Sequence, residues 1–172
     1  KESGKLLKQK DKKIDKVYSS DLKRANETAI LAMREGKYRH LFKNNKLIMT
    51  KNVAVNERDY GDLTGLNKEE TADKFGKDKV HIWRRSFDVN PPGGESLKDV
   101  VNRVQPYFET EIRKDIYEGK NILLAAHGNS LRALFLILEF STIENISSVE
   151  IPTGKPYIIE FQDKKIINRY FL

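Results

Sequence analysis

The sequence predicts an α/β protein, a three-layer sandwich in which helices cover a mostly parallel central sheet. Short apolar runs typical of strands alternate with stretches of helical periodicity along the 172 residues. The clearest alternation is at residues 122–126, an apolar run that ends beside a histidine and leads into the helical pattern 131–140. This order of elements favours parallel strands, each followed by a crossover helix.

The first third of the chain begins with a helical pattern over residues 1–10 that has no capping residue. A strand is predicted over 14–19, and Ser20 or Asp21 is expected to cap the helix that follows it and ends near Arg34, closed by a glycine. The apolar face of that helix has the spacing expected for a helix, with Leu22, Ala25, Ala29 and Met33. A second strand is expected within residues 47–55.

A long helix is predicted over residues 95–120, where apolar residues recur every three or four positions. Ser96 and Asp99 have the spacing of a capping box at its start, and Pro106 should kink it. Near the end of the chain, the apolar runs 157–161 and 166–171 predict a β-hairpin that turns at Asp163 and Lys164.

Composition narrows the class of protein. The chain has no cysteine, which excludes disulfides and thiolate chemistry and fits a cytoplasmic protein. Its longest apolar run falls far short of the roughly 20 residues that span a bilayer, so no membrane partner is expected. The net charge of +7 comes largely from lysines near the start, without any nucleic-acid module signature. We therefore expect a small anionic partner and no nucleic acid.

Two strand ends place polar side chains where open α/β sheets bind ligands. His127 follows the predicted strand 122–126, and Arg24 lies in the first turn after the strand 14–19. A cation at a helix N-terminus opposes the helix dipole unless an anion is bound there. A lone histidine at such a position is more simply explained as a helix cap or a buried structural group. The pair of cationic side chains favours an anion site.

Residues 56–94 are too long for a plain connection, and we expect them to form a substrate-binding loop insertion. This segment contains a short helix whose predicted cap, Asn67, has Glu70 three residues later. It also contains the adjacent arginines Arg84 and Arg85, whose guanidinium groups suit phosphate oxygens. The simpler interpretation is two solvent-exposed arginines on a helix.

Together these segments resemble the 2,3-bisphosphoglycerate-dependent phosphoglycerate mutases of the histidine phosphatase superfamily. The matching segments are 18–25 (YSSDLKRA), 56–68 (NERDYGDLTGLNK), 83–85 (WRR), 94–97 (GESL) and 126–132 (AHGNSLR). They occur in the same order as in that family and extend from residue 18 to about 156, nearly the whole chain.

The resemblance implies a glycolytic and gluconeogenic isomerase of the cytoplasm. It would interconvert 3-phosphoglycerate and 2-phosphoglycerate, with 2,3-bisphosphoglycerate as phosphoryl primer and no metal. Glu57 would transfer protons, while His127 and Arg24 would contact the transferring phosphoryl group, so these three would be catalytic. The substrate would be bound by Arg24, Glu57, Arg58, Asp59, Tyr60, Lys68, Arg84, Arg85, Gly128 and Asn129. The family also implies a homo-oligomer, a dimer or tetramer.

One part of the family pattern is absent from the sequence. The nucleophile of the family is a histidine in an Arg-His-Gly motif after the first strand, and these 172 residues contain no such motif. We therefore expect residues 1–172 to form a single phosphoglycerate mutase-like domain that is incomplete at both ends. The phosphohistidine loop would then lie outside this chain, and the chain alone would be inactive.

Two other functions remain open at this point. A histidine-type phosphatase would share the fold and hydrolyse small phosphoesters instead of shuttling a phosphoryl group. A non-catalytic pseudoenzyme would have lost the nucleophile and kept the anion pocket. Mutase turnover that depends on added bisphosphoglycerate would exclude the phosphatase. The mass of the purified protein would distinguish a pseudoenzyme of these 172 residues from a longer mutase.

Overall fold

A computed structural model describes residues 1–172, apart from the side chain of Lys68. The chain divides into two compact units, which are described separately. The first comprises Lys1–Asn56, Tyr107–Ala126 and Ile151–Leu172, and the second comprises Glu57–Pro106 and His127–Glu150. The prediction of a single domain with a substrate-binding insertion at 56–94 stays a prediction.

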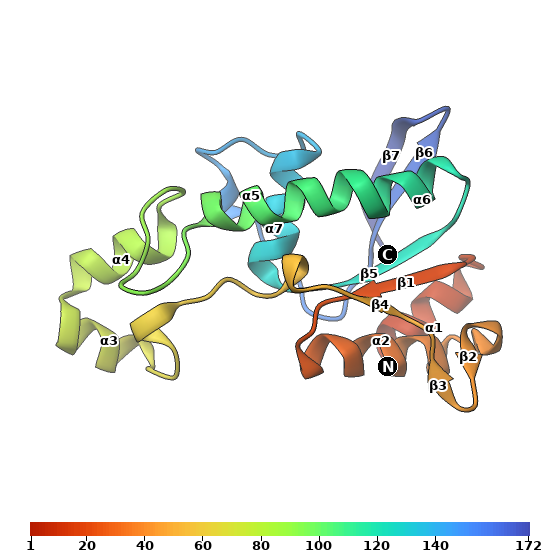
Figure 1. Cartoon of the computed structure of the whole chain (residues 1–172), viewed down its shortest axis with the longest axis horizontal. Helices are drawn as coiled ribbons and strands as arrows, with labels where there is room; N and C mark the ends of the chain where they lie inside the picture. Colours follow the sequence, from red (N-terminus) through yellow and green to blue (C-terminus); the bar gives the residue numbers. More distant parts are fainter. The chain divides into compact units, whose positions relative to one another are not determined.

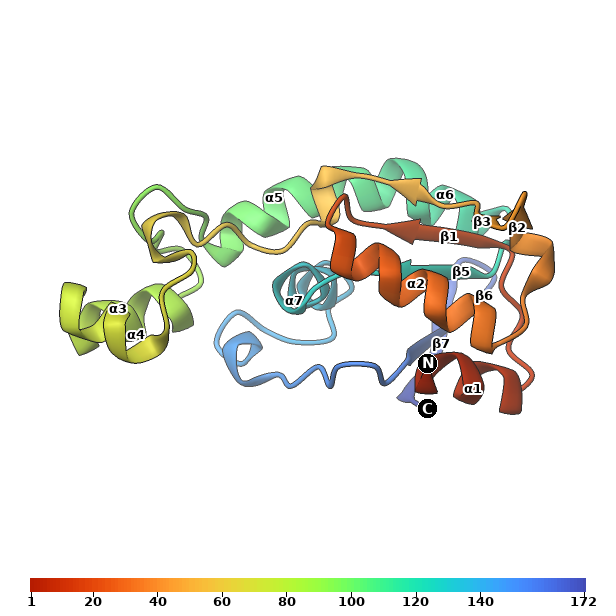
Figure 2. The ribbon, with the colours of Figure 1, turned by 90° about the horizontal axis from the view of Figure 1, so that it is seen from below.

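The first unit is built on a parallel sheet with the strand order β4-β1-β5. Strand β1 (Lys16–Ser19) pairs with β4 (Thr50–Lys51) on one side and with β5 (Ile122–Ala125) on the other. Helix α2 (Lys23–Glu35) lies on one face of this sheet and α6 (Arg113–Tyr117) on the opposite face (Figures 1 and 2). The predicted three-layer α/β fold with a parallel central sheet is confirmed.

The core of the first unit lies between the sheet and α2, and α1 (Glu2–Gln9) packs on the outside of α2. Its buried apolar residues include Val17 of β1 and Ala29 and Met33 of α2. At Gly4 the two helices approach so closely that a Cβ would lie 2.1 Å from the Ala32 carbonyl oxygen. Glycine at this position is what lets α1 pack against α2.

A β-hairpin of β6 (Tyr157–Gln162) and β7 (Lys165–Phe171) completes the first unit, as predicted. Asp163 and Lys164 form its turn, both with positive φ, the backbone geometry that matches the twist of a two-residue hairpin loop. A smaller hairpin joins β2 (Phe42–Lys43) to β3 (Lys46–Leu47), after the turn η1 (Arg39–Leu41).

The second unit contains α3 (Lys68–Phe75) and α4 (Lys77–Arg85), two neighbouring helices in Figures 1 and 2. The predicted capping box of α3 is present, since Asn67 and Glu70 each accept the other's backbone N–H. Phe75 and Trp83 pack edge to face with ring centroids 5.5 Å apart, which joins the two helices. Short 3-10 turns η3 (Gly61–Leu63) and η5 (Ile146–Ser148) also belong to this unit.

The predicted long helix is α5 (Leu97–Tyr107), a π turn at Phe108–Ile112, and then α6. Its capping box is confirmed, because Asp99 accepts the Ser96 N–H and Ser96 Oγ accepts the Asp99 N–H. The helix continues through Pro106, and the wider π turn follows within the next helical turn. The predicted kink stays a prediction.

Two element boundaries and the burial of one strand in the first unit differ from the sequence-based predictions. The N-cap of α2 is Leu22 and not Ser20 or Asp21, because Ser20 Oγ accepts the Leu22 N–H in a turn before the helix. Within 47–55 only Thr50–Lys51 pairs with the sheet, and residues 53–55 form the 3-10 turn η2 (Val53–Val55). Strand β5 is half-buried instead of buried, since it lies at one end of the strand order.

Candidate active site

The segment that carries Glu57 is shaped by a turn and tied to a second loop. Asp59 Oδ1 accepts the Gly61 N–H at 2.8 Å, which closes the turn, and Gly61 has a φ of +53°. A Cβ on Gly61 would lie 2.2 Å from the Pro92 carbonyl oxygen, so only glycine allows this approach. The Asp62 N–H then donates to Pro92 O at 2.9 Å and fastens the two loops together.

The carboxylate of Glu57 lies at the start of α7 (Gly128–Ile137). Its Oε1 accepts the Arg58 N–H at 2.8 Å and the Asn129 N–H at 3.2 Å. Asn129 is in the first turn of α7, where backbone N–H groups have no partner within the helix and the dipole favours negative charge. These two backbone N–H groups therefore hold the Glu57 side chain in a fixed position.

His127 is the N-cap residue of α7 and is only 7% exposed. Its backbone N–H donates to Ser130 Oγ at 3.0 Å, which ends the preceding segment and starts the helix. The helix consequently begins at Gly128, three residues before the predicted start, and ends at Ile137. The hydrogen bond from the His127 N–H to Ser130 Oγ uses the main chain of His127, so this contact does not depend on the imidazole.

Two arginines converge on Tyr60. The Arg58 guanidinium lies 4.5 Å from the centre of the Tyr60 ring, and that of Arg84 lies 5.8 Å from it. Tyr60 Oη in turn accepts a hydrogen bond from Asn129 Nδ2 at 3.1 Å. Arg58 is 4% exposed, and among the described residues the buried Nε atoms of Arg58 and Arg84 have no hydrogen-bond partner. Buried guanidinium donors without partners suit a bound oxyanion.

The two adjacent arginines of α4 point to different partners. Whereas Arg84 lies by Tyr60, the exposed Arg85 donates from Nη1 to the Ser147 carbonyl oxygen at 2.9 Å, in the turn η5. Successive residues on a helix are about 100° apart, so neighbours in sequence face different directions. A substrate-binding role for both arginines stays a prediction.

The structure says less about three further predicted residues, which are Asp59, Lys68 and Arg24. Asp59 uses its carboxylate to shape its own loop, and the side chain of Lys68 lies outside the described residues. Arg24 is exposed in the first turn of α2, which belongs to the first unit. The roles implied for these three by the family resemblance stay predictions.

Sequence reasoning missed three residues that contact the site. Glu95 and Arg103 form an ion pair next to the Glu57 segment, with an Nε–Oε1 distance of 2.8 Å. Arg132, one turn after Gly128, donates from Nε to Val149 O at 3.1 Å. A Cβ on Gly128 would lie 3.2 Å from Arg132 Nη1 and 3.8 Å from Glu57 Oε2, so this glycine keeps the space between them open. Glu95 lies in the GESL motif, but nothing in the sequence pairs it with Arg103.

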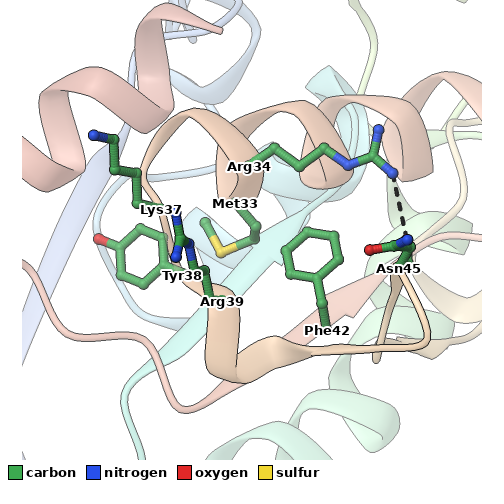
Figure 3. Close-up of a pocket in the computed structure, with 7 residues that line it drawn as sticks. All are labelled: Met33, Arg34, Lys37, Tyr38, Arg39, Phe42 and Asn45. Carbon is green, nitrogen blue, oxygen red and sulfur yellow. Dashed lines mark hydrogen bonds between the residues drawn. The ribbon is translucent and has the colours of Figure 1, made fainter.

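The described residues contain no group of three or more His, Asp or Glu side chains placed to hold a metal ion. In this part of the chain, no helix has both the length and the apolar character to cross a membrane. A cavity of about 600 Å³ in the first unit, shown in Figure 3, is lined by Met33, Arg34, Lys37, Tyr38, Arg39, Phe42 and Asn45. None of these is a predicted site residue.

A carboxylate and a buried histidine at the start of α7, together with two arginines whose Nε atoms are buried, form an arrangement suited to binding and reacting with a phosphoester. Residues 2–170 match the family described as histidine phosphatase superfamily (branch 1), and the chain belongs to this superfamily.

Two relatives indicate which family within the superfamily the chain belongs to. A protein of Parvibaculum lavamentivorans is 45% identical over 95% of this chain and 75% of its own length. One of Methylocella silvestris is 49% identical over 92% of this chain and 74% of its own length. Both are named 2,3-bisphosphoglycerate-dependent phosphoglycerate mutase. Within the superfamily, the chain belongs to this mutase family, and the predicted isomerase class is confirmed.

Solved structures agree on the fold. The α-ribazole phosphatase of Shigella flexneri aligns with a TM-score of 0.74 at 21% identity, over 99% of this chain and 80% of its own. A mycobacterial glucosyl-3-phosphoglycerate phosphatase aligns with a TM-score of 0.72 at 20% identity, over 98% of this chain and 80% of its own. At such identities the likeness shows the fold alone, and this confirms the predicted fold class.

Proposed function

We propose that this chain provides the substrate-binding and proton-transferring part of a phosphoglycerate mutase that interconverts 3-phosphoglycerate and 2-phosphoglycerate. One observation carries the proposal above all: the Glu57 carboxylate is fixed at the start of α7, in the same unit as Arg58 and Arg84, whose Nε atoms are buried. The reaction requires a proton carrier among cations that bind a carboxylate and a phosphate.

The arginines account for binding of the substrate and of the bisphosphoglycerate primer. The Nε groups of Arg58 and Arg84 are buried without a partner among the described residues, which fits oxyanions of either molecule. Asn129 Nδ2 donates a hydrogen bond to Tyr60 Oη at 3.1 Å, and these two side chains would orient the bound molecule from the same side. The primer, when bound, supplies the phosphoryl group that starts the cycle.

Glu57 would accept a proton from the attacking hydroxyl group of the substrate and return it in the reverse step. Its Oε2 faces the space left open by Gly128, while Oε1 is occupied by the N–H groups of Arg58 and Asn129. His127 would lie beside the transferring phosphoryl group and stabilise its charge, and Arg24 would contact the same group.

The phosphoryl-carrying histidine would lie in a segment outside these 172 residues, because no Arg-His-Gly motif occurs among them. The protein would be a cytoplasmic homo-oligomer, a dimer or a tetramer, and would act in glycolysis and gluconeogenesis. The name of its relatives supports the metabolic role, and the absence of cysteine from the sequence fits the cytoplasm.

The test compares the full-length gene product with a protein made of residues 1–172 only. We expect the full-length protein to interconvert the two phosphoglycerates only when 2,3-bisphosphoglycerate is added, and the shorter one to show no turnover. Release of inorganic phosphate without isomerisation would instead identify a phosphatase. If the purified full-length product has the mass of residues 1–172 and no turnover, the pseudoenzyme alternative is correct.

A further inference from the structure

The segment between Glu57 and Asp59 is held by an ion pair between Glu95 and Arg103. Arg103 lies on α5, and Glu95 lies just before that helix. Arg103 Nε donates to Glu95 Oε1 at 2.8 Å, and Nη2 donates to Glu95 Oε2 at 2.9 Å. Such two-bonded pairs have a fixed geometry as well as a strong attraction.

Both members of the pair also contact the backbone on either side of Arg58. Arg103 Nη2 donates to the Glu57 carbonyl oxygen at 3.3 Å, before Arg58. Glu95 Oε2 accepts the Asp59 N–H at 2.9 Å, after it. The backbone N–H of Glu95 donates to the Asp59 carbonyl oxygen at 2.8 Å. Three main-chain groups are thus fixed around one residue.

The environment of the Glu95–Arg103 pair favours strong hydrogen bonds to the backbone around Arg58. The side chains of Arg103 and Glu95 are 23% and 27% exposed, so water competes only partly for their hydrogen bonds. Burial disfavours the charged form of Glu95, but the hydrogen bonds from Arg103 and the Asp59 N–H outweigh it and lower the pKa of this carboxyl group. Glu95 therefore remains an acceptor for both partners at neutral pH.

We propose that Glu95 and Arg103 are positioning residues that fix the backbone of Glu57 and Arg58, an inference that rests on the proposed function. The backbone sets where the Glu57 carboxylate meets the Asn129 N–H and where the Arg58 guanidinium meets the Tyr60 ring. A proton carrier displaced by about 1 Å can lose up to about 100-fold in rate. Neither positioning residue is assigned a contact with substrate.

The experiment uses the Arg103→Lys variant of the full-length protein, which keeps the charge and loses the planar, two-bonded geometry. We expect kcat to fall about tenfold, while KM changes less than kcat, because proton transfer depends most steeply on position. Glu95→Gln should have a similar effect, and the double variant should be no worse than either, since the two act as one unit. The kcat of Arg103→Met should be lower than that of Arg103→Lys, because methionine also removes the charge.

The matched control is Arg113→Lys. Arg113 is also paired with a glutamate, Glu109, and its side chain is 21% exposed, close to the 23% of Arg103. It lies on α6, in the other unit. This variant should melt at a lower temperature if loss of the pair matters to stability, but its kcat should equal that of the wild type.

A second measurement, hydrogen–deuterium exchange at the Asp59 amide, does not depend on turnover. We expect faster exchange in Arg103→Lys and Glu95→Gln than in Arg113→Lys. Unchanged exchange, or faster exchange with unchanged kcat, would overturn the inference. If the wild-type full-length protein has no mutase turnover, the proposed function fails, and exchange alone decides: faster exchange still supports a backbone role for the pair, and unchanged exchange rejects it. If Arg103→Lys does not fold, Glu95→Gln provides both measurements.

Discussion

The Glu57 carboxylate accepts the backbone N–H of Asn129 at 3.2 Å, although the two residues are 72 positions apart. The contact joins the start of the 56–94 segment to the first turn of α7. It places the predicted proton carrier, Glu57, beside Asn129. Two motifs that are far apart in the sequence therefore meet in the structure.

Glu57→Gln should abolish most of the turnover of the full-length protein. An amide oxygen can still accept the N–H groups of Arg58 and Asn129, so the loop should keep its shape, but an amide cannot accept the substrate proton. We expect kcat to fall by roughly 10²–10⁴-fold, with a melting temperature close to that of the wild type. Steady-state kinetics and a thermal melt check both; an active variant would remove Glu57 from the mechanism.

His127→Ala should also reduce turnover, by roughly 10²-fold or more, because the phosphoryl group loses a preorganised stabilising group. Folding should survive, since the capping contact with Ser130 Oγ uses the His127 main chain. Ser130→Ala is the complementary variant and should lower the free energy of unfolding by about 1 kcal/mol through loss of the cap. A His127→Ala protein that is fully active but unstable would make this histidine purely structural.

The two arginines of α4 can be separated by kinetics. Arg84→Ala removes a guanidinium group whose buried Nε has no partner among the described residues, so KM should rise by roughly 10- to 100-fold. Arg85→Ala breaks the contact with Ser147 and is expected to weaken substrate binding too, although less. If Arg85→Ala leaves both KM and kcat unchanged, Arg85 does not bind the substrate.

Asp115 should make stability depend on pH. Burial opposes its ionisation, but hydrogen bonds from Lys120, Lys16 and Tyr18 outweigh burial and hold its pKa well below the ordinary value. A lowered folded-state pKa contributes stability above the unfolded-state pKa of about 4, and this contribution is lost as the pH falls below that value.

Urea unfolding of Asp115→Asn tests this. Breaking a buried charge cluster should cost about 3 kcal/mol at pH 7, and the difference from the wild type should shrink at pH 3. Asp73→Asn, an exposed position, serves as control and should change little at either pH. A difference that is the same at pH 3 and pH 7 would contradict the prediction.

Gly4→Ala should destabilise the protein, although glycine to alanine within a helix normally stabilises by about 1 kcal/mol. The new Cβ would lie 2.1 Å from the Ala32 carbonyl oxygen and force α1 away from α2. We expect a loss of about 1–3 kcal/mol in the free energy of unfolding. Lys5→Ala, at the next and exposed position, is the control. A stabilised Gly4→Ala variant would show that the two helices can separate without cost.

The sequence by itself determined the features that depend on residues close together in the chain. The capping boxes at Asn67 and Ser96 and the hairpin turn at Asp163 were all predicted correctly, because each depends on contacts within three or four residues. The alternation of apolar runs likewise predicted the α/β class. The family followed from the order of its motifs.

Only the tertiary structure decided which side chains meet. It separated Arg84 from Arg85, reduced the strand expected within 47–55 to Thr50–Lys51, and paired Glu95 with Arg103 beside the backbone of Glu57. Contacts of this kind depend on how distant segments pack and on the direction in which each side chain leaves its helix or loop. No local pattern in the sequence encodes either, so the fold class and the family could be predicted, whereas the contacts within the site could not.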